Sequence, residues 1–158
     1  MTTLRPGTEA DLELIAGLIR ALAEYERLSD DVTFDEDVLR RNLFGPRPYA
    51  ETLIAEVDGT PAGFALYFHN FSTFMGKPGI YLEDLFVKPE HRGAGIGRTL
   101  LAGLAAIAIE RDCGRLEWSV LNWNEDALGF YRRLGAKPNS EWTVYRLAGE
   151  PLTSLATS

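Results

Sequence analysis

The chain has 158 residues, of which 46% are hydrophobic and 25% charged, and its net charge is −7. These totals are typical of one soluble globular domain, residues 1–158, that is large enough to bury a core. The negative charge argues against a nucleic-acid partner, and no apolar run approaches the roughly 20 residues of a membrane helix.

The N-terminus and the cysteine content favour a cytoplasmic location. Residues Met1–Pro6 lack the apolar core of a secretion signal. Cys113 is the sole cysteine, which excludes an internal disulfide and suits a reducing compartment. We expect Cys113 to be structural rather than nucleophilic. His69 and His91 are far apart in the sequence, so no metal site is expected.

Apolar periodicity and turn residues predict the elements of the chain. Thr8 with Asp11, and Thr33 with Glu36, resemble capping boxes that begin two helices. The predicted strands are Thr3–Pro6, Thr52–Val57, Ala62–Phe68, Ile80–Val87, Leu116–Leu121 and Trp142–Leu147, with a turn over Asp58–Pro61. The predicted helices are Leu12–Ala23, Val38–Leu43, Thr99–Ile109 and Asn124–Leu134, followed by a loosely ordered tail over 149–158. This order predicts a mixed sheet covered by helices, an α/β domain in the broad sense.

The segment Arg92-Gly93-Ala94-Gly95-Ile96-Gly97 lies between a predicted strand and a predicted helix. Alternate glycines at a helix start leave backbone N–H groups exposed, and with the helix dipole these groups form an anion site. Arg92 adds a charged donor. The mononucleotide loop pattern is absent, and the dinucleotide fingerprint fails because Arg98 or Leu100 stands where its third glycine belongs. The segment therefore predicts a site for a phosphorylated cofactor.

Two motifs resemble those of the GCN5-related N-acetyltransferase (GNAT) superfamily. Arg92, Gly95 and Gly97 meet the family's pyrophosphate-loop pattern Gln/Arg-x-x-Gly-x-Gly/Ala. Asn124 and the segment Phe130–Ala136 match its second signature, an asparagine followed by Phe-Tyr and a helix-ending glycine. The resemblance covers nearly the whole chain. It implies a central, mostly antiparallel twisted sheet flanked by helices, with acetyl-CoA as the cofactor.

A narrower resemblance is to the spermidine/spermine (diamine) and thialysine acetyltransferase branch. It is carried by Ala23–Glu26, Tyr81–Val87 and Trp123–Glu125. Where that branch has a further acid before the last strand, this chain has Thr143, which leaves room for a shorter diamine or a lysine-like side chain. The resemblance implies direct transfer of an acetyl group to the primary amine of a small cationic substrate.

The resemblance also implies roles for individual residues. A free alkyl amine has a pKa of about 10.4, so a base must remove its proton, and we expect Glu83 to do so directly or through a water. Tyr131 is the expected general acid for the departing thiolate, and Asp84 is expected on the face opposite Glu83 if the strand is regular. The expected cofactor-binding residues are Leu85, Phe86, Val87, Arg92, Gly93, Ala94, Gly95, Ile96, Gly97, Arg98, Asn124, Ala127 and Tyr131. The expected substrate-binding residues are Tyr25, Glu26, Glu83, Asp84, Glu117, Trp118 and Ser119.

Two alternatives stay open from the sequence. The acceptor is a protein N-terminus or lysine in the first, and the chain is a non-catalytic CoA-binding sensor in the second. The acidic stretch Glu24–Asp37 suits a cationic small molecule or a basic peptide equally, and is otherwise a solvated surface. The branch implies a homodimer, which the aromatic residues Phe71 and Phe74 permit.

Overall fold

The computed structural model describes residues 1–158 and divides into two compact units, Met1–Ser119 and Val120–Ser158. In the first unit the strands are β1 (Thr2–Pro6), β2 (Glu51–Val57), β3 (Thr60–Ser72), β4 (Lys77–Val87) and β5 (Leu116–Trp118). Its helices are η1 (Glu9–Asp11), α1 (Leu12–Tyr25), η2 (Ser29–Asp31), α2 (Glu36–Phe44), η3 (Pro89–His91) and α3 (Ile96–Glu110). The second unit holds α4 (Glu125–Arg133) and α5 (Gly149–Ala156).

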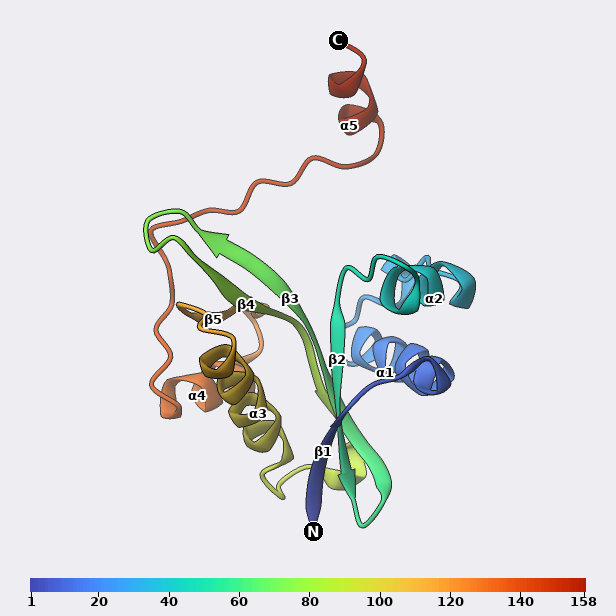
Figure 1. The fold of residues 1–158 in the computed structure, drawn as a ribbon, viewed down its shortest axis with the longest axis vertical. Helices are drawn as coiled ribbons and strands as arrows, with labels where there is room; N and C mark the ends of the chain where they lie inside the picture. Colours follow the sequence, from blue (N-terminus) through green and yellow to red (C-terminus); the bar gives the residue numbers. More distant parts are fainter. The chain divides into compact units, whose positions relative to one another are not determined.

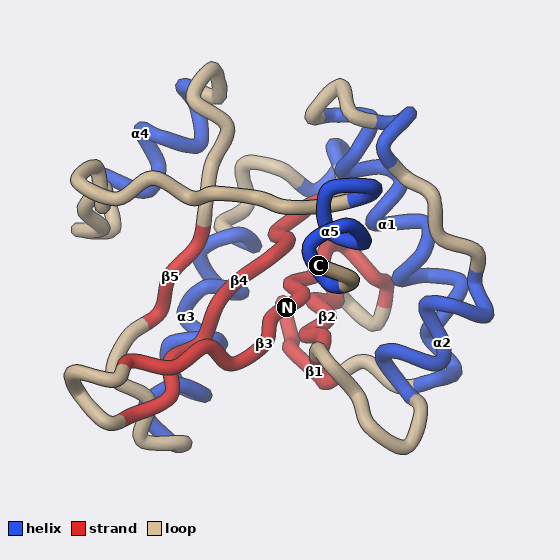
Figure 2. Tube along the Cα trace, turned by 90° about the horizontal axis from the view of Figure 1, so that it is seen from above, coloured by secondary structure: helices blue, strands red, loops and turns tan.

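The sheet of the first unit has the strand order β1-β2-β3-β4-β5. The first three pairings are antiparallel, and β4 pairs with β5 in parallel, so the predicted mixed, mostly antiparallel sheet is confirmed. β1 is an edge strand, as Pro6 predicted. In Figures 1 and 2, α1 and α2 lie on one side of this sheet and α3 on the other.

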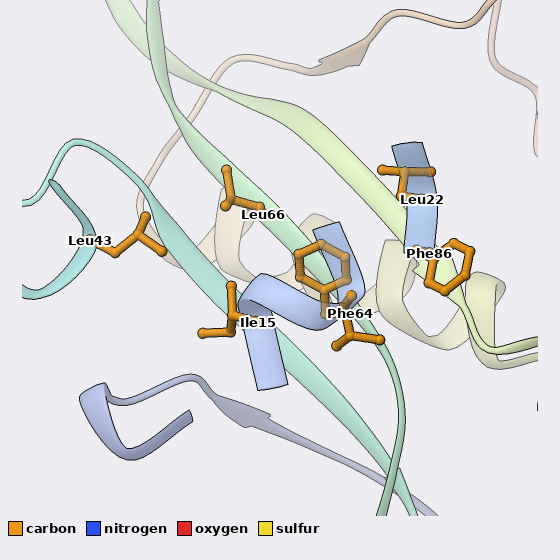
Figure 3. Packing of buried hydrophobic residues seen from close by; sticks show 7 residues of the cluster. Ile15, Leu22, Leu43, Phe64, Leu66 and Phe86 are labelled. Atoms are coloured by element: carbon orange, nitrogen blue, oxygen red, sulfur yellow. The ribbon is translucent and has the colours of Figure 1, made fainter. Parts of the chain in front are cut away.

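The core between the sheet and α1 is a cluster of aliphatic and phenylalanine side chains. Its buried members are Ile15, Leu18, Leu22, Leu43, Phe64, Leu66 and Phe86, drawn in Figure 3. Ile15, Leu18 and Leu22 recur at helical spacing along α1, while Phe64 and Leu66 lie two residues apart on β3. The 3.6-residue period of the helix and the 2-residue period of the strand thus bring one apolar face of each together.

On the other side of the sheet, α3 approaches the strands closely at Gly103. A Cβ atom at this position would lie 2.6 Å from Leu4 Cδ1 and 2.9 Å from Leu53 Cδ2. Glycine therefore lets the helix backbone pack directly on the side chains of β1 and β2.

Local signals predicted most element boundaries, with small differences. The N-cap of α2 is Asp35 rather than Thr33, since Asp35 Oδ1 accepts a hydrogen bond of 2.8 Å from the Val38 N–H. The turn between β2 and β3 is two residues long, because Asp58 and Gly59 both adopt positive φ angles, +49° and +82°. α3 begins at Ile96, three residues before the predicted start, since Gly95 is its N-cap.

The C-terminal region differs most from the sequence prediction. The predicted strand Trp142–Leu147 is wrong, because these residues have no regular secondary structure. The predicted loose tail contains α5, in which Leu152 and Leu155 recur at helical spacing. None of the helices has the length and apolar character required to span a bilayer.

Candidate active site

β4 and β5 separate part-way along the sheet. Their parallel pairing runs from Ile80 and Leu116 to Leu82 and Trp118, where β5 ends, three residues before the predicted Leu121. On the other side of β4, Leu66 pairs with Asp84 and Tyr67 with Leu82, which leaves Glu83 as an extra, bulged residue. The bulge bends β4, and the last residues of β4 continue past the end of β5.

Beyond the bulge, one edge of β4 has no strand beside it. The Lys88 N–H donates to the Ala62 carbonyl at 2.8 Å, so Lys88 faces β3 and, by alternation, Leu85 and Val87 face away from it. Of the three residues expected to pair with a pantetheine arm, only Leu85 and Val87 direct their peptide groups to this free edge. The peptide groups of Phe86 face β3.

The glycine segment after β4 adopts the conformation of an anion-binding nest. Gly93 and Gly95 have φ angles of +84° and +80°, which only glycine adopts readily, and Gly95 is the N-cap of α3. A Cβ atom added at either glycine would meet no protein atom within 4 Å. The space in front of the loop is thus open, and its exposed N–H groups at a helix start fit a pyrophosphate.

Three carboxylates interact near the bulge. Burial, followed by the charges of Glu83 and Glu26, raises the pKa of Asp84 from 3.8 to about 6. Burial and the charge of Glu83 also raise the pKa of Glu26, at the C-terminal end of α1. Asp84 was expected on the face opposite Glu83 if the strand were regular. The strand is bulged at Glu83, so the alternation on which this expectation depended does not apply there. We refer to Glu26, Glu83 and Asp84 as the acidic cluster.

The predicted substrate residues of β5 lie beside β4, just before the bulge. Glu117 Oε1 accepts a hydrogen bond from Asn70 Nδ2 (3.0 Å) and forms an ion pair with Arg115 Nε (2.8 Å), so this carboxylate is held within the sheet edge. Ser119 Oγ lies 2.6 Å from Tyr81 Oη. Tyr81 was not predicted as a site residue, although its place two residues before Glu83 was the available signal.

Arg92 lies between the glycine loop and α1. Its Nε donates to the Val87 carbonyl at 2.9 Å, and its Cζ lies 5.0 Å from the ring centroid of Tyr25 and 5.4 Å from that of Phe86. Arg92 directly precedes the glycine nest, and its guanidinium also contacts Tyr25, a predicted substrate residue.

The second unit contains the remaining predicted site residues. Asn124 is the N-cap of α4, and its Oδ1 accepts a hydrogen bond of 3.3 Å from the Ala127 N–H. Tyr131 is half-buried in the same helix, with its ring centroid 5.6 Å from that of Phe130. Gly135, at φ +86°, follows the helix end as predicted.

A separated strand pair, a glycine nest and the two motifs together point to one family, and residues 16–136 match the model of the Acetyltransferase (GNAT) family. The chain belongs to this family. A thialysine N-epsilon-acetyltransferase of Bos taurus is 40% identical to it, over 97% of this chain and 96% of that protein. The L-ornithine N5-acetyltransferase NATA1 of Arabidopsis thaliana is 29% identical, over 96% and 86% of the two chains.

The fold of this GNAT protein also matches solved structures. An integron cassette protein from the mobile metagenome of V. cholerae, VCH_CASS6, superposes with a TM-score of 0.83 at 29% identity, over 99% of this chain and 98% of that one. The protein is accordingly an N-acetyltransferase, and its resemblance to the diamine and thialysine branch is confirmed.

Proposed function

We propose that the protein transfers an acetyl group from acetyl-CoA to the side-chain amine of a small cationic amino acid or diamine. The observation that carries the proposal is the acidic cluster at the β4 bulge, where the sheet opens and the glycine nest follows within the same unit. Along β4 and the loop after it, the acidic cluster supplies negative charge for the acceptor amine. The strand edge beyond the bulge supplies backbone groups for the cofactor, and the glycine nest supplies the site for its phosphates.

The donor side is supported by the loop geometry. The N–H groups from Gly93 to Arg98 would hold the pyrophosphate, and Leu85 and Val87 would pair with the pantetheine arm as an added strand. Acetyl-CoA, when bound, supplies the activated acetyl group. Asn124 and Ala127, joined at the start of α4, are proposed to complete this side.

The acceptor side is supported by charge. A cationic amine is attracted by Glu26, Glu83 and Asp84, whose mutual repulsion it relieves. The amine must lose its proton before it can attack, and a carboxylate of the cluster, Glu83 or its neighbour Asp84, is the proposed base. The Tyr131 hydroxyl is the proposed donor of a proton to the departing sulfur. No residue needs to carry the acetyl group covalently.

The relatives' names narrow the acceptor class. Thialysine N-epsilon and L-ornithine N5 are both amines at the end of an amino-acid side chain. Thr143, in place of a further acid, fits such a short acceptor better than a long polyamine, which carries more positive charge. A protein or peptide acceptor and a non-catalytic CoA sensor are the competing functions.

We further propose a cytoplasmic homodimer that binds neither nucleic acid nor membranes. In the hairpin between β3 and β4, Phe71 is 60% exposed and Phe74 fully exposed, and large apolar side chains that one chain leaves in solvent favour association with a second copy. Light scattering coupled to size exclusion tests this, and a monomer at micromolar concentration would contradict it.

A thiol-release assay with acetyl-CoA tests the proposed function. The amine panel contains thialysine, lysine, ornithine, diamines, spermidine, spermine and amino-terminal peptides. We expect the highest kcat/KM for a side-chain amine of a small amino acid or diamine. Glu26→Gln should raise the KM for that amine, while Glu24→Gln, an exposed neighbour on α1, serves as the matched control. Activity on peptides alone, or on no amine, would refute the proposal.

A further inference from the structure

The junction between α1 and the start of the glycine loop is loosely packed. A pocket of about 550 Å³ lies there, lined by Leu14, Gly17 and Ala21 of α1 and by Lys88, Pro89 and Arg92 on the other side. Part of the junction is therefore open space, although Leu18 of α1 and Phe86 of β4, which also line the pocket, belong to the packed core.

Arg92 spans the junction with three contacts. It donates to the Val87 carbonyl at the end of β4 (2.9 Å), and its guanidinium carbon is within 5.4 Å of two ring centroids, those of Tyr25 and Phe86. Both distances fall inside the roughly 6 Å range of a cation–π interaction. Phe86 is buried and belongs to the core, whereas Tyr25 is the last residue of α1 and is 40% exposed. The guanidinium thus ties the end of the helix to a fixed point of the sheet.

The contacts of Arg92 lie between the cofactor side and the acceptor side of the proposed site. On one side Arg92 is followed directly by Gly93, the first glycine of the nest. On the other, Tyr25 precedes Glu26, a member of the acidic cluster. Arg92 is therefore connected to Glu26 through one ring and one peptide bond.

We propose that Arg92 is a positioning residue that fixes Tyr25 and Glu26 for the acceptor amine and thereby couples acceptor binding to occupancy of the glycine loop. This inference rests on the proposed function for the identity of the two ligands. It differs from the expectation that Arg92 serves only as a charged donor to phosphate, because that role would leave the end of α1 unaffected.

Kinetics of matched variants test the coupling. Arg92→Gln should raise the KM of the acceptor amine roughly tenfold, because it loses two weak cation–π contacts, and Tyr25→Leu, which loses one of them, should raise it roughly threefold. The double variant should be no worse than Arg92→Gln alone, because the contact that Tyr25→Leu removes is already lost in Arg92→Gln. Arg92→Lys should restore the amine KM in part, since it keeps the charge without the planar group. Arg47→Gln, which removes an arginine lying 5.9 Å from the Tyr49 ring, is the control and should match the wild type.

A second readout does not depend on acetyl transfer. Amide hydrogen exchange over residues 22–26 should be faster in Arg92→Gln than in the wild type and in Arg47→Gln. In the wild type it should slow when CoA is added, and this slowing should be lost in Arg92→Gln.

The outcomes separate the two proposals. If Arg92→Gln raises only the acetyl-CoA KM, with amine KM and exchange unchanged, or if the two single effects multiply in the double variant, the positioning role is overturned. A wild-type protein that acetylates no amine would overturn the proposed function, and the exchange comparison would still decide whether Arg92 holds the end of α1.

Discussion

Replacing Asp84 by asparagine should remove a specific pH dependence of stability. The pKa of Asp84 is raised from 3.8 to about 6. Between these values the folded state binds more protons than the unfolded state, so the free energy of unfolding falls as the pH rises through this window. Each pKa unit corresponds to about 1.4 kcal/mol, so ionised Asp84 destabilises the fold by about 3 kcal/mol at high pH, of which about 1.5 kcal/mol develops between pH 5 and pH 8.

Urea unfolding of the wild type and Asp84→Asn at pH 5 and pH 8 measures this effect. The stability advantage of the variant should be about 1.5 kcal/mol larger at pH 8, because asparagine cannot ionise. Asp31→Asn, which removes one charge from the exposed surface of η2, corrects for the change in net charge. An advantage that is the same at both pH values would refute the raised pKa and with it the electrostatic account of the acidic cluster.

Three further predictions concern the proposed chemistry and the core. Tyr131→Phe should lower kcat by roughly 10²-fold or more while CoA affinity, measured by calorimetry, stays near the wild-type value; unchanged turnover would exclude Tyr131 as the acid. Gly95→Asp should abolish CoA binding through its side chain, its charge and the strain of a positive φ angle, while circular dichroism still shows a folded protein because a Cβ there meets no protein atom; retained binding would place the phosphate elsewhere. Phe64→Ala should cost about 3–5 kcal/mol in urea unfolding because Phe64 is fully buried, and a loss below 1 kcal/mol would contradict the packing in Figure 3.

Features encoded by neighbouring residues could be predicted from the sequence. The nest at Gly93 and Gly95 and the helix stop at Gly135 each depend on a few adjacent residues, and both were found where the sequence indicated. The family followed from the same local motifs, because phosphate binding constrains backbone conformation directly.

Features that depend on pairing between distant segments could not be worked out from the neighbouring residues. The bulge at Glu83 arises from the register between β3 and β4, which no residue near Glu83 specifies. The strand expected over Trp142–Leu147 has a suitable composition, but strand formation also requires a partner. The contact of Arg92 with Tyr25 joins residues on separate elements, so the motif that includes Arg92 gave no sign of it.

The extra residue at the β4 bulge has a consequence for the shape of the sheet. Glu83, the one extra residue of β4, bends the strand just after its parallel pairing with β5 ends, and the sheet opens at this edge. Deleting Glu83 would make Leu82 and Asp84 neighbours opposite Tyr67 and Leu66, while Phe86 keeps Phe64 as its partner and its place in the core. The extra residue of β4 therefore acts on the site and not on the core: removing it would take away the bend beside the acidic cluster and leave the packing of Phe86 against Phe64 unchanged.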